Sequence, residues 1–482
     1  MRTRQVLLPF VVFLSLLSAA ARAQEQPWTS LFDGKRLHKD VGKNGDVKIV
    51  DGRVELKHGG NMDFSAFIDC WRDNCTRAWF DFTTEMMTEV KANGCVALVP
   101  IISGVGDMLY AVIVIDNSRD LDLTLSGVRK TGSITNGPSQ FKSVAKDGEW
   151  FKLRVRMEDR HLQVWVNEKL VTDRNGTYAG GLSVTAHSRD AKIALRNMRV
   201  QRLPPKAEHK ADTVEPDKIA RQIAYLQQPS FKCFPLINYH IHLKGDLTLE
   251  KALAHSRASG VFYGIAANCG VKFPITNDQG IDDYVQKLEG QPCFIGMQAE
   301  GREWPTLFSK EAIAKFDYIF TDGMTIVDHR GKRARLWIPE EVDIPDKQAF
   351  MELLVRTIEN ILDNEPVDIY ANPTYLPDVI AKEYDTLWTP ERLKRVIDAA
   401  ARNGVAIEIS NRLKLPKADF IRQARQAGIK FTIGTNNVDS NLGREEYALQ
   451  MIRECDLSCH DMFLPKPDGK KPIQVRGFKM KK

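Results

Sequence analysis

The chain has 482 residues, of which 43% are hydrophobic and 27% charged, and its formal net charge at pH 7 is +6. This charge is small for the length and is spread over mixed-sign segments, which argues against a nucleic-acid-binding protein. At about 150 residues per domain, the length allows two or three domains with ample core. After the first residues, no apolar run approaches the roughly 18 residues that a membrane span needs.

The first 23 residues have the pattern of an export signal. Arg2 and Arg4 form a basic start, an apolar run covers residues 6–17, and Ala21-Arg22-Ala23 is a small-x-small cleavage site. We therefore expect cleavage near Ala23 and a periplasmic or secreted location. No cysteine follows the cleavage site, which argues against a lipoprotein anchor.

Eight cysteines in an exported chain allow disulfides. Cys70 and Cys75 lie close together in a polar segment, and Cys455 and Cys459 have the spacing of neighbours on a helix. A local disulfide or free thiols are both open for each pair. Cys459-His460 is a weak zinc motif because a second ligand pair is missing.

The next part, residues 24–203, consists of short alternating runs separated by Gly, Asn and Asp. Residues 149–157 and 162–166 alternate strictly between apolar and polar side chains, with a hairpin turn at residues 158–161. Many short strands at regular spacing predict an all-β sandwich or jelly roll. A polar, proline-bearing linker is expected over residues 204–230.

Three motifs in this first domain resemble the domain named for 3-keto-disaccharide hydrolases, a concanavalin-like β-sandwich. They are Trp28–Lys35, the hairpin region from Glu149 to Val171, and the closing Lys192–Val200. The resemblance implies a carbohydrate-related hydrolase or a sugar-binding module, and it assigns no catalytic residue. Residues 80–139 depart from the family pattern by being more apolar, which puts a sugar site there in doubt.

The third part, residues 231–465, alternates short apolar runs with helical stretches, and a basic tail follows over residues 466–482. The apolar runs are Leu236–Tyr239, Val261–Ala267, Cys293–Gln298, Asp317–Thr321, Val367–Ala371, Val405–Ile409 and Lys430–Gly434. Between them, Thr389 and Pro390 have the pattern of a helix start, and Gly260, Gly404 and Gly428 that of helix ends. This alternation predicts parallel strands covered by helices, in a barrel-like or doubly wound α/β domain.

The first apolar run ends in His240-Ile241-His242. Residues i and i+2 of a strand project to the same side, so both imidazoles can aim at one point beyond the strand. A divalent metal fits that point, although two unrelated polar histidines would explain the motif alone equally well. The chemistry of such barrels lies at the carboxyl ends of the strands. Side chains that can act as ligands stand at the ends of the other runs: Asn268, Cys269, Glu300, Asp322, Asn372, Glu408, Asn436, Asn437 and Asp439.

Residues 403–411, followed by Gly434-Thr435-Asn436-Asn437, look like the last two motifs of the polymerase and histidinol phosphatase (PHP) superfamily. Those enzymes are distorted seven-stranded (β/α) barrels that open on a His-x-His strand. The resemblance covers most of the third part of the chain. It implies that His240 and His242 are metal ligands and that Glu408 is the bridging carboxylate.

The chain departs from this pattern at several ligand positions. The family's Asp-His pair falls on Asn268-Cys269, one of its later histidines on Asn372, and its closing Asp-x-His on Asn436-Asn437-Val438. Amides bind transition metals poorly, and three divalent ions would leave a large uncompensated charge in the site. We therefore expect one divalent metal, Zn, Mn or Fe, in place of the family's trinuclear site. Its expected ligands are His240, His242 and Glu408.

These residues predict an exported hydrolase that cleaves an ester, phosphoester or glycosidic bond of a saccharide or a phosphorylated small molecule. Asp322 or Glu300 is expected to act as general base. The expected substrate-binding residues are Asn268, Asn372, Asn436, Asn437 and Arg302. The sequence does not determine the oligomeric state.

Two other hypotheses stay open. The first is a saccharide hydrolase or lyase whose chemistry lies in the β-sandwich. The second is a non-catalytic carbohydrate-binding protein with a degenerate PHP site, in which amides and carboxylates bind sugar hydroxyls. Trp304, Trp337 and Trp388 suit sugar recognition, while ordinary packing explains each of them taken singly. The basic segment Arg330–Arg335 is either a surface loop or a contact for an anionic substrate.

Overall fold

The computed structural model describes both predicted domains. The described residues are 26–68, 78–89, 94–99, 111–117, 129–134, 139–175, 181–186, 192–204, 218–226 and 234–477. The predicted export signal and its cleavage site lie outside this set, and so do Cys70 and Cys75.

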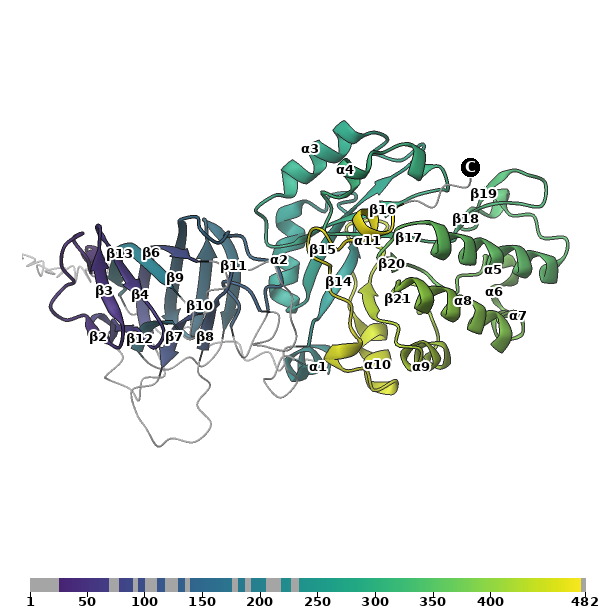
Figure 1. Cartoon of the computed structure of the whole chain (residues 1–482). Helices are drawn as coiled ribbons and strands as arrows, with labels where there is room; N and C mark the ends of the chain where they lie inside the picture. The colour runs from purple at the N-terminus through teal and green to yellow at the C-terminus, as the bar shows by residue number, and fades with distance from the viewer. Residues whose placement is uncertain are drawn as a thin grey trace, which may run out of the picture.

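The first domain is a sandwich of two antiparallel sheets, in purple and blue in Figure 1. The strands of the larger sheet are β1 (Thr29–Ser30), β3 (Val47–Val50), β4 (Arg53–Leu56), β6 (Ala78–Thr88), β9 (Phe151–Asp159), β10 (His161–Val166), β11 (Lys169–Asn175) and β13 (Ile193–Arg202). Those of the smaller sheet are β2 (Gly42–Asn44), β5 (Asn61–Asp63), β7 (Gly94–Val99), β8 (Ala111–Ile115) and β12 (Gly181–Ala186). The described strand orders are β11-β10-β9-β6-β13-β4-β3, with β1 on β13, and β2-β5-β12-β7-β8.

The alternating pattern of the hairpin explains the sandwich locally. Phe151, Leu153 and Val155 of β9 are buried, while the residues between them face outward. Strand β10 repeats this alternation and pairs with β9 across a tight turn at Asp159, whose φ is 62°. The predicted two-sheet sandwich is therefore confirmed, and its core lies between the two sheets.

The second domain is a closed barrel of parallel strands, in teal, green and yellow in Figure 1. Its strands are β14 (Ile237–Ile241), β15 (Phe262–Cys269), β16 (Phe294–Ala299), β17 (Tyr318–Thr321), β20 (Ile369–Tyr370), β21 (Ala406–Ser410) and β22 (Phe431–Gly434). They pair in this order, and β22 closes on β14. Each strand corresponds to one predicted apolar run, so the predicted seven-stranded (β/α) barrel is confirmed.

Helices cover the outside of the barrel. They are α2 (Leu249–Ser259), α3 (Asp278–Leu288), α4 (Lys310–Ile313), α5 (Lys347–Asn364), α6 (Asp378–Ala381), α7 (Tyr384–Leu387), α8 (Pro390–Asn403), α9 (Ala418–Gln426) and α10 (Glu446–Glu454). The Thr389 side chain caps α8, and Gly404 and Gly260 end α8 and α2 in the left-handed conformation, as predicted. A hairpin of β18 (Thr325–Val327) and β19 (Arg333–Arg335) lies between β17 and α5.

The barrel domain takes in residues from both flanking segments. Helix α1 (Lys218–Leu226) lies in the predicted linker, and its Ile223 and Leu226 join the barrel's apolar core. The predicted basic tail includes α11 (Pro472–Val475), and Lys471 beside it is buried. The Lys471 ammonium donates to the carbonyls of Ala314 and Phe316, so this part of the tail is anchored and not solvated.

The sandwich contacts the barrel at the amino-terminal ends of the barrel strands. Phe141 of the sandwich packs edge-on against Phe262 at the start of β15, with ring centroids 5.6 Å apart. The Lys142 ammonium lies 2.6 Å from the carboxylate of Asp317, which directly precedes β17. The carboxyl-terminal ends of the strands therefore form the opposite end of the barrel.

Four cysteines of the barrel domain are free thiols. Cys455 and Cys459 are buried and unbonded, as are Cys269 and Cys293. A local disulfide or free thiols were both open for Cys455 and Cys459, and the structure shows free thiols. Among the described residues, no helix combines the length and hydropathy that crossing a membrane requires.

Candidate functional site

The carboxyl-terminal ends of the barrel strands bring together most of the predicted site residues. Their buried members are His240, His242, Glu300, Asp322, Asn372, Glu408 and Asn437. His240 and His242 both stand on β14 or directly after it, and their ring centroids lie 5.1 Å apart at an interplanar angle of 80°. The alternation of the strand explains this, because residues i and i+2 share one side.

His240 is held by Glu408 of β21, which is separated from β14 by the strand β22. Its Nδ1 lies 2.6 Å from Glu408 Oε2, and both side chains are buried. Gly434 makes the approach possible, since a Cβ at this position would lie only 2.2 Å from that oxygen. Among the described residues, neither His240 Nε2 nor Glu408 Oε1 has a hydrogen-bond partner.

His242 has a similar arrangement. Its Nδ1 lies 2.9 Å from the Ala266 carbonyl, which identifies Nδ1 as the protonated nitrogen. Burial lowers the pKa of His242 well below its usual value, and the neighbouring His240 lowers it further. The ring is therefore neutral at pH 7. Its Nε2 carries a lone pair that has no hydrogen-bond partner in the described part of the chain.

These two imidazoles have the arrangement that metal-binding histidines usually adopt. In each ring Nδ1 is engaged by a carboxylate or a carbonyl, and Nε2 remains available. No group of three or more His, Cys, Asp or Glu side chains within the described residues is arranged to hold a metal. His240 and His242 are therefore two neighbouring side chains, each with an unpartnered Nε2, and not a complete ligand set. Glu408 Oε2 contacts His240 Nδ1, while Glu408 Oε1 has no partner among the described residues, so its role as a third ligand stays a prediction.

Glu300 and Asp322 form a pair of buried acids next to the imidazoles. Burial raises the pKa of Glu300 to about 8, and the charge of Asp322 contributes to that rise. Burial also raises the pKa of Asp322, against the Met324 amide that donates to its Oδ1 over 3.0 Å. Glu300 is therefore mainly protonated at neutral pH. Two neighbouring buried carboxyl groups whose pKa values are raised are typical of acid–base sites.

The predicted substrate-binding amides have different surroundings and hydrogen-bond partners. Asn268 donates to Glu300 Oε1 over 2.7 Å, and Asn372 donates to Asp322 Oδ2 over 3.3 Å. Asn437 exchanges hydrogen bonds with the backbone of His242, so it holds that residue in place. Asn436 is half-buried in a left-handed conformation, with φ of 53°. Of the two amides beside the acids, Asn372 keeps a buried Oδ1 without a partner among the described residues.

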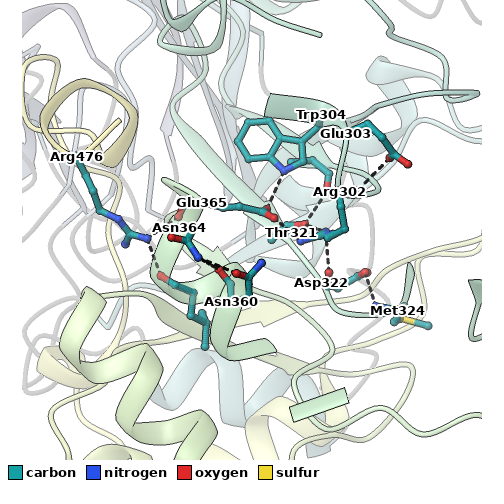
Figure 2. A network of polar contacts seen from close by, with 12 residues as sticks. Arg302, Glu303, Trp304, Thr321, Asp322, Met324, Asn360, Asn364, Glu365 and Arg476 are labelled. Carbon is teal, nitrogen blue, oxygen red and sulfur yellow. Dashed lines mark hydrogen bonds and ion pairs between the residues drawn. The ribbon is translucent and has the colours of Figure 1, made fainter. Parts of the chain in front are cut away.

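Arg302, the predicted cationic contact for substrate, is bound within its own domain (Figure 2). Its guanidinium donates to Glu365 Oε1 over 2.7 Å, to Thr321 Oγ1 over 2.8 Å and to the backbone carbonyl of Asp322 over 3.0 Å. Glu365 was not predicted as a site residue. It directly follows α5 and precedes β20, and no local pattern indicates its role.

Lys244 is a second residue that the sequence interpretation did not assign. It is half-buried two residues after His242, and burial lowers the pKa of its ammonium, with Arg412 adding to the effect. Its position close to His242 is the sequence feature that could have identified it as a site residue. Trp304 and Trp388 are buried and donate to Glu365 and to the Thr374 carbonyl, which is the packing role left open for them.

The basic segment Arg330–Arg335 forms a surface hairpin, and much of its charge is neutralised. Arg330 pairs with Asp328 and Asp343, and Arg335 pairs with Glu341. Trp337 beside it is 38% exposed. Arg333 lies 4.0 Å from Glu303, so all three arginines of the segment have a carboxylate partner, and the segment is a surface loop.

Comparison with known proteins identifies the first domain. Residues 27–201 match the family model of the 3-keto-alpha-glucoside-1,2-lyase-like domain. This confirms the resemblance predicted for the sandwich. No curated protein matches the chain.

Several solved structures are similar to one domain or the other. A provisionally assigned glycosyl hydrolase of Parabacteroides distasonis is 19% identical and covers 37% of this chain and 100% of its own, with a TM-score of 0.29. Histidinol phosphate phosphatase from Lactococcus lactis, solved with zinc, L-histidinol and phosphate, is 15% identical, with coverages of 48% and 99% and a TM-score of 0.34. The carbohydrate-binding module CBM66 from Bacillus subtilis is 11% identical, with coverages of 36% and 94% and a TM-score of 0.22.

Proposed function

We propose that the carboxyl-terminal end of the barrel is a hydrolytic site for an ester, phosphoester or glycosidic bond. The observation that carries this proposal is a buried acid pair, Glu300 and Asp322, next to two buried imidazoles with free Nε2 atoms. Buried acids with shifted pKa values are suited to general acid and general base roles.

The two acids take different roles. Glu300 is protonated at neutral pH, so it donates its proton to the leaving oxygen as the bond breaks. Asp322 accepts the proton of the attacking water, whose oxygen forms the new bond to the acyl, phosphoryl or glycosyl centre. Asn372 orients Asp322 through Oδ2, and Asn268 orients Glu300 through Oε1. The sequence left the general base open between these residues; we assign it to Asp322 because a pKa of about 8 suits Glu300 to the role of general acid.

The two imidazoles define the cofactor side of the site. His240 and His242 would hold one divalent cation through Nε2, and such a cation polarises a substrate oxygen and lowers the pKa of water. Glu408 fixes the orientation of His240 by accepting from Nδ1, and the Ala266 carbonyl does the same for His242. Both contacts select the tautomer with a lone pair on Nε2.

The substrate class follows from the first domain. Its match to the 3-keto-alpha-glucoside-1,2-lyase-like family supports a saccharide as the molecule that the protein binds or processes. The sandwich contacts the barrel at the amino-terminal ends of the strands, through Phe141 and Lys142. A second candidate function is therefore a saccharide hydrolase or lyase activity that resides in the sandwich and is independent of the barrel site.

The test uses the full-length chain and a panel of p-nitrophenyl substrates: acetate, phosphate and β-glucoside. We expect turnover of one of them to fall above pH 8, because Glu300 then loses its proton, and Glu300→Gln to remove this descending limb. Asp322→Asn should lower kcat by about 10³-fold. Asp368→Asn, a matched change at a buried acid elsewhere in the barrel, should leave the profile unchanged.

The two candidate functions give opposite results with one substrate. If the chain cleaves a 3-keto-glucoside and if Asp322→Asn and His240→Ala leave that activity intact, the chemistry lies in the sandwich. If both variants abolish it, the chemistry lies in the barrel.

Export is part of the same proposal. The basic and apolar start of the chain supports cleavage near Ala23 and a periplasmic or secreted protein. Amino-terminal sequencing of the protein from a fractionated cell should find Gln24 first. A cytoplasmic protein that retains Met1 would contradict this.

A further inference from the structure

Arg302 lies on the loop that follows β16, two residues after Glu300, where its guanidinium could have faced a substrate. Figure 2 shows instead that it turns towards Glu365 and the end of β17. Its Nη2 donates both to Thr321 Oγ1 over 2.8 Å and to the carbonyl of Asp322 over 3.0 Å. Thr321 Oγ1 in turn donates to the Ala299 carbonyl over 2.6 Å. The arginine therefore joins the ends of β16 and β17, which carry the two acids.

Glu365 holds Arg302 in this orientation. Its Oε1 accepts from Arg302 Nη1 over 2.7 Å and its Oε2 from Trp304 Nε1 over 2.8 Å, so both oxygens are used. The backbone carbonyl of the same residue accepts from Arg476 over 2.8 Å. Glu365 is buried, and a buried carboxylate with fixed partners keeps a guanidinium in one position.

We propose that Arg302 is a positioning residue of the barrel site, held by Glu365 so that it fixes the backbone of Asp322 and places a positive charge beside the acid pair. This inference rests on the proposed roles of Asp322 and Glu300. Arg302 itself does not contact the reacting atoms.

The charge of Arg302 acts on both acids. Burial raises the pKa of Asp322 and of Glu300, and the Arg302 charge opposes that rise in each. Without this charge, the pKa of both acids would rise further. Arg302 thus acts on the site in two ways: it positions the Asp322 backbone, and its charge lowers the pKa of both acids.

The first measurement does not depend on turnover. The carboxyl carbons of the metal-free, full-length chain are titrated by ¹³C NMR, with Asp322→Asn and Glu300→Gln used for assignment. We expect Arg302→Met to raise the pKa of both acids, since it removes the nearby positive charge. Arg302→Lys, which keeps the charge, should stay close to the wild-type titration. If both acids titrate as in the wild type when Arg302→Met is folded, the proposal is wrong.

The second measurement separates positioning from substrate binding. With the p-nitrophenyl substrate that the wild-type chain cleaves, we expect Arg302→Lys and Glu365→Gln to lower kcat by about 10²-fold and to change KM less than about twofold. A residue that binds substrate would raise KM instead, at unchanged kcat, and that result would overturn the proposal. Arg330→Met, an arginine on the surface hairpin, is the matched control and should change neither.

The two measurements also separate this proposal from the function on which it rests. A wild-type chain that cleaves none of the substrates, while Arg302→Met still moves the two titrations, would contradict the hydrolytic function and support the link between Arg302 and the acids. Should Arg302→Met fail to fold, the comparison of Arg302→Lys and Glu365→Gln with Arg330→Met decides in its place.

Discussion

The two ends of the barrel differ although the same strands build both. At the amino-terminal end, aromatic side chains fill the space, with Phe141 of the sandwich packed against Phe262 and Phe294 nearby. At the carboxyl-terminal end, four buried polar atoms have no partners among the described residues: His240 Nε2, His242 Nε2, Glu408 Oε1 and Asn372 Oδ1. Interiors normally satisfy such atoms, so the unpartnered cluster marks the end where a ligand is expected.

Asp368 shows why an unpartnered atom alone does not make a site. It is buried near the start of β20, its Oδ1 has no partner among the described residues, and its Oδ2 accepts from the Ile319 amide over 3.0 Å. Burial raises its pKa to about 7, as burial raises that of Glu300. The barrel thus contains similar buried acids in two places, and only the place that also has imidazoles and a second acid suits catalysis.

The largest expected effect comes from the imidazoles. His240→Ala and His242→Ala each remove one Nε2 and should lower turnover by about 10³-fold. Each should also abolish stoichiometric binding of zinc, measured by elemental analysis after loading and gel filtration. His460→Ala, at an exposed histidine, is the control. If zinc content and turnover are unchanged in both variants, the carboxyl-terminal end of the barrel is not its functional end.

Asp368→Asn tests the buried acid at the amino-terminal end. In the wild type, the unfolded chain releases this proton near the ordinary value of 3.8 and the folded chain near 7, so the free energy of unfolding falls as pH rises between them. The variant lacks this fall. The difference in unfolding free energy, variant minus wild type, should therefore be larger at pH 8 than at pH 4 by up to about 4 kcal/mol. Urea unfolding at several pH values measures it. Parallel pH curves for the two proteins would show that Asp368 is ionised when folded.

Phe141→Ala tests the packing between the domains. The side chain is 2% exposed, and removing it leaves a cavity at the barrel end, so we expect a loss of about 3 kcal/mol of unfolding free energy. The kcat of the folded variant should not change, because the site lies at the other end of the barrel. Tyr225→Ala, at an exposed aromatic residue, is the matched control. A large fall in kcat would mean that the two ends are coupled.

The smallest expected effect is that of Lys142→Met. The Lys142–Asp317 pair joins the domains over 2.6 Å, but both side chains are about a quarter exposed, so water and salt screen it. We expect a loss of about 0.5 kcal/mol, which 0.5 M NaCl should largely remove. Lys315→Met, at an exposed pair with Asp282, gives the background value. A loss that equals that of Phe141→Ala would show that charge, and not packing, joins the domains.

The sequence by itself determined the elements of both domains. Alternation in residues 149–157 predicted a half-buried strand, and the fully apolar runs from Leu236 onward predicted the parallel strands of the barrel. The His-x-His motif placed two imidazoles on one side of β14, and the helix caps at Thr389 and Gly404 were read correctly. These features depend on neighbours within a few residues, and such neighbours are visible in the sequence.

Only the tertiary structure decided how the site residues are used. The contact between His240 and Glu408 spans 168 positions, and that between Arg302 and Glu365 spans 63. Both depend on which strands become neighbours when the barrel closes. The protonation of Glu300 depends on burial and on the charge of Asp322, which no local pattern encodes. The sequence thus identified the candidate residues, while the contacts that form when the barrel closes determined their partners and their protonation.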